Sequence, residues 1–177
     1  MKILRSIKAK LANRSFASKN KYLRENGCQI GENTRLLCYV GNLGSEPYMV
    51  KIGKDCLISH NVNFFTHDGG VKLLNSLDYF KGESMDKVGF ITVGDNCFIG
   101  NGAKIMPGVT IGDNVIVGTG AIVTKDVPSN CIVAGVPAKV ICTIDEYYQK
   151  NKDSFVPTGR MSPAEKKQYI LKKYKAE

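Results

Sequence analysis

The sequence predicts a β-solenoid built from six-residue repeats, and three features of the repeat predict it. Aliphatic residues recur at every sixth position without a break between Val93 and Val123. Gly follows many of them, as in "VGDN" at 93–96 and "IGDN" at 111–114. The fifth position of each repeat holds a small or β-branched residue. Neither an α-helix, with its period of 3.6, nor an alternating strand produces a sustained period of six.

Each position of the repeat has an expected structural role. The first position points into the core from a short flat strand, and the turn after it favours Gly, Asn and Asp because it needs positive φ or close backbone approach. The fifth position also points inward, where only a small residue fits. Three repeats make one triangular coil, and coils stack at about 4.8 Å. The expected inward residues of the long run are Val93, Ile99, Ile105, Ile111, Val117 and Val123 (first position) and Cys97, Ala103, Val109, Val115, Ala121 and Val127 (fifth position).

The same pattern occurs earlier in the chain, with first positions at Ile30, Leu36, Ile52, Ile58 and Phe64. Residues 41–50 break its phase and are expected to form a loop. Cys28, Cys56 and Cys97 fall in fifth positions, so we interpret them as small core residues rather than catalytic thiols.

Composition and charge narrow the class of protein. The 177 residues are expected to form one domain core. The net charge of +9 is uneven: residues 1–24 carry eight Lys or Arg and no acid, whereas residues 25–144 carry nine basic and eleven acidic residues. The near-neutral repeat region argues against nucleic-acid binding. Six cysteines without a CxxC pair, and two histidines, predict no metal site and a reduced, cytoplasmic protein.

Two segments leave the repeat. Residues 69–90 form an insertion, which we expect to be functional because long irregular loops are uncommon in so regular a domain. Residues 145–177 are expected to form a helical tail. In that tail Ser162 is the expected N-cap, Pro163 the first helical residue and Glu165 the partner that closes a capping box.

Residues 1–26 are expected to form a basic, amphipathic helical segment, with Ile3, Leu4, Ile7 and Leu11 on one face. Such a helix could lie on an anionic bilayer at the inner face of the membrane, because clustered Lys and Arg are attracted to acidic lipid. It could instead pack on the end of the solenoid and cover its open edge strands, which is the role we favour.

Residues 27–144 resemble the hexapeptide-repeat acyltransferases, above all in "GTGAIVTKDVPSNCIVAGVPAKVI" at 118–141. Within that family the sequence is most similar to sugar and polysaccharide O-acetyltransferases near the maltose/galactoside and xenobiotic branches. The resemblance implies a mainly β fold: a single-stranded left-handed parallel β-helix with an inserted loop, a short N-terminal helix and a C-terminal helix. It also implies a homotrimer with active sites between neighbouring prisms, and acetyl-CoA as the donor.

Transfer of an acetyl group to a hydroxyl needs a general base, and only His60 and His67 supply imidazoles. His67 lies in "NFFTHDGG", where the repeat gives way to the insertion and where the family places its histidine base. His67 is therefore the expected base, whereas His60 occupies a turn inside a regular repeat. A backbone carbonyl is the expected partner of the second ring nitrogen of His67. Asp68 is an alternative partner, but we expect it to contact acceptor hydroxyls or to cap the loop turn.

By resemblance, backbone N–H groups bind the reacting thioester. The amide of Asn101, in "FIGNGA", is expected to hold the oxyanion. The amide of Thr119, beside Gly118, is expected to hold the pantetheine arm. The alternative is that these glycine-rich corners are only turns.

Also by resemblance, four residues are expected at the nucleotide end of CoA. Lys125 and Lys139 match the family's basic contacts to the phosphates, and Thr124 and Pro137 are expected to line the adenine end. The alternative for the two lysines is a solvated surface position.

The insertion carries Asp78, Tyr79, Phe80 and Asp86, and aromatic rings beside carboxylates suit a sugar. The alternative is an apolar patch buried against a neighbouring subunit. The sequence therefore predicts an acetyl-CoA-dependent O-acetyltransferase that acts on a sugar or a surface-polysaccharide precursor. An N-acetyltransferase of amino-sugar nucleotides and a non-catalytic scaffold remain alternatives. A zinc hydratase on this fold would need three histidine ligands, and the sequence contains only two histidines, which argues against this class of enzyme.

Overall fold

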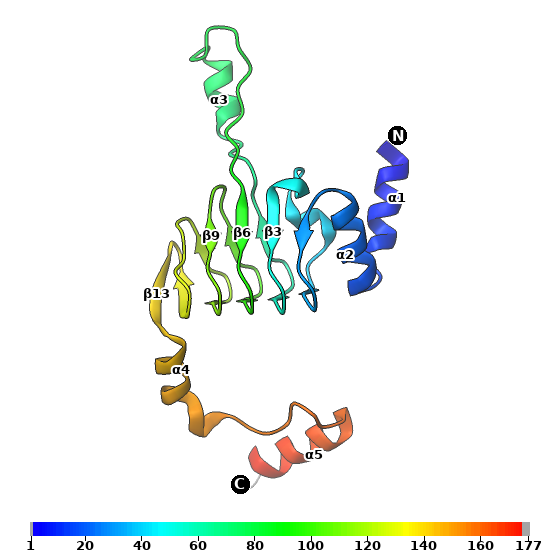
Figure 1. Ribbon diagram of the computed structural model, residues 1–177, viewed down its shortest axis with the longest axis vertical. Helices are drawn as coiled ribbons and strands as arrows, with labels where there is room; N and C mark the ends of the chain where they lie inside the picture. The colour runs from blue at the N-terminus through cyan, green and yellow to red at the C-terminus, as the bar shows by residue number, and fades with distance from the viewer. Residues whose placement is uncertain (1, 175–177) are drawn as a thin grey trace. The chain divides into compact units, whose positions relative to one another are not determined.

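The computed structural model describes residues 2–174, and the side chains of residues 7–174. The chain divides into two compact units, residues 1–144 and residues 145–177. The first unit is a triangular prism of stacked coils preceded by two helices (Figure 1).

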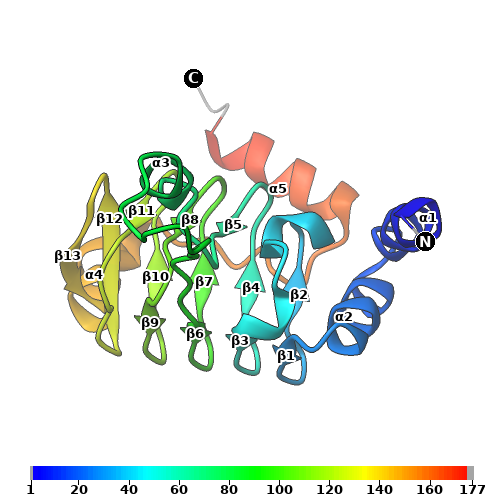
Figure 2. The ribbon, with the colours of Figure 1, turned by 90° about the horizontal axis from the view of Figure 1, so that it is seen from above.

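Each face of the prism is a sheet in which strands of successive coils pair in parallel; the exceptions are the antiparallel pair β12–β13 and the third side of the first coil, which has no strand. The first face contains β1 (Gln29–Ile30), β3 (Val50–Ile52), β6 (Ile91–Val93) and β9 (Thr110–Ile111). The second face contains β2 (Arg35–Leu36), β4 (Leu57–Ile58), β7 (Phe98–Ile99), β10 (Ile116–Val117), β12 (Cys131–Gly135) and β13 (Ala138–Thr143). The third face contains β5 (Asn63–Phe64), β8 (Lys104–Ile105) and β11 (Ile122–Val123). Figure 2 shows the corners of successive coils in line.

The strand register stacks the repeats position upon position. Ile58 pairs with Ile99, and Phe64 pairs with Ile105. All the first and fifth positions predicted to point inward are buried, from Ile30 to Val127. The prediction that Cys28, Cys56 and Cys97 are core residues is also confirmed, and burial raises the pKa of Cys28 to about 12.

The corners explain why Gly and Asn recur in the repeat. Asn96 and Asn114 adopt positive φ (53° and 55°), and the Asn96 Nδ2 group donates to Asn114 Oδ1 at 2.9 Å in the next coil. At position 94 glycine is required for a different reason, which is the close approach of the next coil. A Cβ there would lie 2.3 Å from Asp113 Oδ1 and 2.7 Å from the Gly112 carbonyl carbon. Gly and Asn therefore fill corner positions where larger side chains would strain the backbone or clash.

The N-terminal segment forms two helices rather than the single helix expected from its sequence. The helices are α1 (Lys2–Ala12) and α2 (Phe16–Glu25). The break occurs because Ser15 adopts an extended conformation and its Oγ accepts the N–H of Ser18 at 3.1 Å, which starts a new helix. The side chains of Ile3 and Leu4 lie outside the described residues.

Helix α2 covers the open end of the prism. Within the stack, amides such as that of Gly31 donate to carbonyls of the next coil, whereas corner amides such as that of Asp55 donate back to the preceding coil. Carbonyls of the first coil that face the open end have no preceding coil to supply donors. Side chains of α2 supply them instead. Lys19 Nζ donates to the carbonyls of Leu36, Leu37 and Cys38 at 2.8–3.3 Å, and Arg24 Nη2 donates to that of Ile30 at 2.7 Å.

Residues 41–50 do not form the expected irregular loop. They contribute to two 3₁₀ helices, η1 (Val40–Leu43) and η2 (Pro47–Met49), which bury Leu43 and Met49. Because η1 packs beside β5, it closes the third side of the first coil. At the other end of the prism, β12 and β13 form an antiparallel hairpin instead of a further coil.

The insertion, residues 69–90, forms an arm that projects beyond the coils (Figure 1). Its base is a short antiparallel pairing, in which the Asp68 N–H donates to the Lys87 carbonyl and the Gly89 N–H to the Thr66 carbonyl, both at 2.9 Å. Helix α3 (Val71–Ser76) follows immediately.

The second unit contains α4 (Ile144–Asn151), η3 (Lys152–Ser154) and α5 (Pro163–Tyr174). The predicted capping box is present, because the Ser162 N–H donates to Glu165 Oε2 at 2.8 Å and the Glu165 N–H donates to Ser162 Oγ at 3.4 Å. Among residues 2–174, no helix has both the length and the apolar character that a bilayer crossing requires.

The Gly94→Ala substitution tests the stacking. The added Cβ meets backbone of the next coil, so we expect a loss of about 1–3 kcal/mol in the free energy of unfolding, as for other overpacked sites. Gly41→Ala is the matched control, because a Cβ at Gly41 has no neighbour within 4 Å. Urea unfolding of both variants measures the difference, and equal stability would contradict the stacking argument.

Candidate active site

His67 lies at the corner that follows the third face, where the arm leaves the solenoid. It comes three residues after the end of β5, and its backbone forms the β-bridge with Val88 at the base of the arm. A pocket of about 440 Å³ opens beside it. The lining residues come from two segments, 41–45 and 63–67. The sequence prediction that His67 marks the boundary between repeat and insertion is confirmed.

The ring of His67 is held by a carboxylate from the preceding coil. His67 Nδ1 lies 3.0 Å from Glu46 Oε2, and Thr66 Oγ1 donates to the same oxygen at 2.5 Å. The Thr66 hydroxyl is the largest cause that lowers the pKa of Glu46 below its ordinary value of 4.5, and His67 adds to it. Glu46 is therefore ionised at neutral pH.

This geometry assigns the tautomer of His67. An ionised carboxylate can only accept hydrogen bonds, so Nδ1 carries the proton that points to Glu46. The other nitrogen, Nε2, then keeps its lone pair. The side chain is 46 % exposed, so a substrate can reach it. A histidine with Nδ1 held by a carboxylate and Nε2 accessible is the arrangement of a general base.

The two partners that the sequence suggested for the His67 ring are both incorrect. Neither a backbone carbonyl nor Asp68 holds Nδ1. Asp68 Oδ1 accepts the Gly70 N–H at 2.9 Å, and its Oδ2 lies 3.3 Å from Lys87 Nζ. Both contacts lower the pKa of Asp68, the Gly70 N–H more strongly. Asp68 therefore caps the turn at the base of the arm, which is one of its two expected roles.

The predicted acceptor residues lie on the arm, after α3. Asp78 Oδ1 accepts the Gly82 N–H at 2.6 Å and closes the turn. Tyr79 is 69 % exposed, whereas Phe80 is partly buried. The arm projects beyond the coils (Figure 1), and none of these three residues lines the pocket beside His67. Asp86 is also an exposed residue of the arm.

Asn101 and Thr119 lie in one row of corners, the row that follows the second face. The row stacks through the backbone, because the Gly120 N–H donates to the Asn101 carbonyl at 2.8 Å and the Gly102 N–H to the His60 carbonyl at 3.0 Å. In the part of the chain that the structure describes, the amides of Asn101 and Thr119 have no acceptor. Both are thus available to a ligand. Gly118 has a structural role, since its N–H donates to the Val133 carbonyl.

The residues expected at the nucleotide end of CoA are exposed near the C-terminal end of the prism. Thr124 and Lys125 lie at the corner that follows β11, in the same corner row as His67. Pro137, which follows a cis peptide bond, and Lys139 lie in the β12–β13 hairpin.

The expected site residues of one chain thus fall on two edges of the third face. His67 is in the row after that face, whereas Asn101 and Thr119 are in the row before it. Six residues of nearly extended chain separate the two rows, which is about 15–20 Å. A single chain therefore does not bring the base and the two free amides together.

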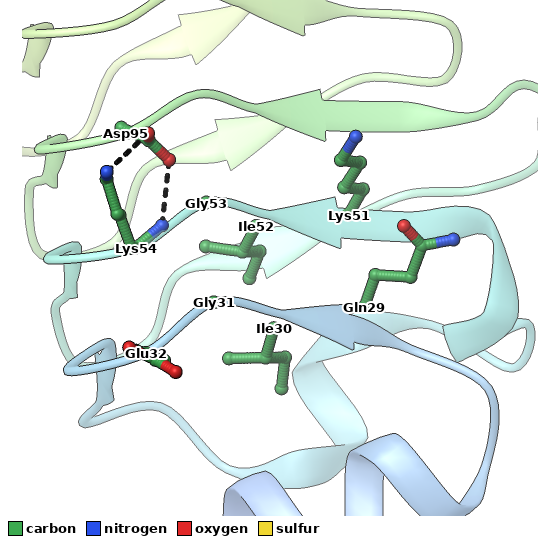
Figure 3. Close-up of a pocket in the computed structure, with 9 residues that line it drawn as sticks. All are labelled: Gln29, Ile30, Gly31, Glu32, Lys51, Ile52, Gly53, Lys54 and Asp95. Carbon is green, nitrogen blue, oxygen red and sulfur yellow. Dashed lines mark hydrogen bonds and ion pairs between the residues drawn. The ribbon is translucent and has the colours of Figure 1, made fainter.

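A second hollow, of about 390 Å³, lies on the first face between β1 and β3 (Figure 3). In it Lys54 contacts Asp95 through its backbone N–H at 2.9 Å and its Nζ at 3.8 Å. None of the predicted site residues lines this hollow. Over residues 2–174, no three His, Cys, Asp or Glu side chains gather as metal ligands would.

Comparison with known proteins supports the fold and the chemistry. The family "Bacterial transferase hexapeptide (six repeats)" matches residues 90–125. Protein CapG of Staphylococcus aureus is 45% identical over 154 residues, which cover 86% of this chain and 87% of CapG. The chain belongs to the hexapeptide-repeat transferases.

Two further members of the family carry informative names. The galactoside O-acetyltransferase of Escherichia coli is 39% identical over 112 residues, 60% of this chain and about half (52%) of that protein. A solved structure of a galactoside acetyltransferase in complex with coenzyme A has a TM-score of 0.61 and 29% identity, and the match covers 81% of this chain and 80% of that one. These similarities confirm the predictions that the fold is a left-handed β-helix and that the protein is an acyltransferase.

Sequence reasoning missed Glu46. One signal for it was available: Glu46 lies in the segment that breaks the repeat in the coil directly before that of His67. Because coils stack, a phase-breaking segment lies beside the corner of the next coil, and a carboxylate there is a candidate partner for a histidine.

Replacement of Thr66 tests what lowers the pKa of Glu46, the carboxylate that contacts His67. Thr66→Val removes the largest cause of the lowered Glu46 pKa, so we expect that pKa to rise in a ¹³C NMR titration. A carboxylate whose pKa is lowered by folding stabilises the fold fully when the pH is above the carboxylate's ordinary pKa of 4.5. This stabilisation is lost as the pH falls through the lowered pKa. Thr66→Val should therefore lose less stability between pH 5 and pH 3 than the wild type. Thr92→Val, on the first face, is the control; an unchanged Glu46 pKa in Thr66→Val would contradict the assignment.

Proposed function

We propose that the protein is an acetyl-CoA-dependent O-acetyltransferase that acts on a hydroxyl group of a sugar or a surface-polysaccharide precursor. The observation that carries the proposal is the His67–Glu46 pair, which leaves Nε2 of His67 free to accept a proton beside an open pocket. The named activity of the galactoside O-acetyltransferases and the coenzyme A complex of one of them support the donor and the acceptor class.

In the proposed reaction, Nε2 of His67 takes the proton of the acceptor hydroxyl while the hydroxyl oxygen attacks the thioester carbonyl of acetyl-CoA. Glu46 stabilises the imidazolium that forms. The negative charge on the carbonyl oxygen is held by the free backbone amide of Asn101. When the intermediate collapses, the C–S bond breaks, and His67 returns its proton to the CoA sulfur. The products are the acetyl ester and free CoA.

We further propose a homotrimer in which His67 of one copy faces the Asn101 and Thr119 amides of a neighbouring copy. Two observations support this. The base and the amides lie on different edges of the same face, about 15–20 Å apart in one chain. The arm also exposes Leu73, Leu77 and Tyr79, each by more than half, which is typical of an arm that packs on another subunit.

The acceptor in this proposal binds in the pocket beside His67, and a neighbouring copy's arm covers it with Asp78, Tyr79 and Phe80. The ring of Phe65 is 41 % exposed beside that pocket, and Asn42 contributes an amide, so the pocket offers an apolar surface and hydrogen bonds for a sugar. We place the reaction in the cytoplasm, where acetyl-CoA is made; the six free cysteines fit a reducing compartment.

Substitution of His67 tests the base. We expect His67→Ala to lower the rate of CoA release by roughly 10²–10⁴, the usual contribution of a general base. Glu46→Gln should lower it by about tenfold or more, because the ring loses the carboxylate that fixes its tautomer. His60→Ala is the matched control and should retain wild-type turnover.

The assay uses acetyl-CoA with a panel of sugars, sugar nucleotides and amino sugars. The best acceptor then separates O-acetylation from N-acetylation. Equal rates for His67→Ala and the wild type would remove His67 from the mechanism, and absence of acetyl-CoA binding and turnover in the wild type would favour a scaffold.

Lys125 and Lys139 give a separate test of donor binding. Since both are exposed, we expect Lys125→Ala and Lys139→Ala each to raise the KM for acetyl-CoA by about two- to fivefold with kcat unchanged. Lys104→Ala, an exposed lysine of β8, is the control. Unchanged KM values in both variants would contradict the phosphate contacts.

A further inference from the structure

In the part of α1 whose side chains the structure describes, the larger apolar residues Ile7 and Leu11 face solvent, which is the reverse of a normal surface helix. Its contact with the body is made by small or polar residues. Ala12 is buried, Ala9 packs against the core, and Asn13 Oδ1 accepts the Val40 N–H at 3.0 Å. In contrast, Ile7 and Leu11 are 50 % and 47 % exposed. Both lie about 160° around the helix from Ala9.

The covering of the prism end does not require α1. Carbonyls of the first coil at the open end accept hydrogen bonds from Lys19, Asn20 and Arg24 of α2, and Leu23 of α2 is fully buried. Helix α1 is the outermost element at that end of the prism, beyond α2 (Figures 1 and 2). The end-covering role and the exposed apolar face therefore belong to different helices.

Charge identifies what the exposed face of α1 fits. Lys8, Lys10 and Arg14 are exposed around Ile7 and Leu11, and residues 1–24 contain no acidic residue. The α1 helix of a second copy has the same positive charge. The C-terminal unit is also basic, with eight basic and five acidic residues in 145–177. Neither complements the charge of α1. An apolar strip among Lys and Arg complements a surface that is anionic outside and apolar just below it.

We propose that α1 docks the protein on an anionic lipid bilayer. Ile7 and Leu11 enter the boundary between headgroups and acyl chains, and the surrounding Lys and Arg side chains bind the acidic headgroups. The helix lies along the surface without crossing it. This contact is independent of the acetyl-transfer chemistry and would bring the pocket to acceptors carried at the membrane.

Flotation of the full-length protein with vesicles tests the proposal. The vesicles contain about 30% phosphatidylglycerol in phosphatidylcholine, and pure phosphatidylcholine vesicles are the neutral comparison. We expect binding to the anionic vesicles alone, with a loss at high salt because exposed charges are screened. Ile7→Ser/Leu11→Ser should weaken the apparent affinity at least about tenfold. Lys8→Glu/Lys10→Glu should weaken it by a similar factor.

Matched control variants distinguish a specific effect of α1 from a general effect of the protein's charge or exposed apolar surface. Lys166→Glu/Lys167→Glu makes the same change of charge on α5, and Leu171→Ser/Tyr174→Ser removes two exposed apolar side chains from the same helix. Both variants should bind as the wild type does. The thermal midpoints of the α1 variants should be unchanged, since all four replaced residues are exposed. Three results would overturn the proposal: no binding of the wild type to anionic vesicles, equal loss in the controls, or a change in oligomeric state of the Ile7/Leu11 variant without a change in vesicle binding.

Discussion

The structure depends on the coil-to-coil backbone hydrogen bonds, in which amides such as that of Gly31 donate to the next coil and corner amides such as that of Asp55 donate back to the preceding one. These bonds keep every repeat position above its counterpart, so one aliphatic residue in six is enough to build a continuous core. They also explain the corner chemistry, because stacked corners leave no room for a Cβ at positions such as Gly94. The first coil has no coil before it, and α2 donates to carbonyls at this open end through Lys19 and Arg24.

His67, Glu46 and the arm, all parts of the candidate site, occur where the chain departs from this stacking. The two 3₁₀ helices replace a strand in the first coil, and the segment between them brings Glu46 to His67. The arm leaves at the corner that carries His67, and its base is fixed by the cap from Asp68. The regular coils act as a rigid support that holds these irregular segments, together with the free amides of Asn101 and Thr119, at defined positions.

The period-six pattern was sufficient to predict the buried positions, since each is determined by residues close in sequence. His67 could be located because it stands where the pattern stops. Glu46 could not be assigned, because its contact with His67 joins two coils and follows only from the path of the first coil. The break between α1 and α2 depends on a local cap at Ser15, which competes with a continuous basic helix. The handedness came from resemblance, since periodicity does not determine it.

The most direct test of the account is a crystal structure of the protein with coenzyme A bound. The account predicts that the CoA sulfur lies within about 4 Å of Nε2 of His67 in one copy, close to hydrogen-bonding range, while the pantetheine chain runs past the Asn101 and Thr119 amides of a neighbouring copy. Coenzyme A bound with its sulfur more than about 10 Å from every His67, well beyond any hydrogen bond, would contradict it.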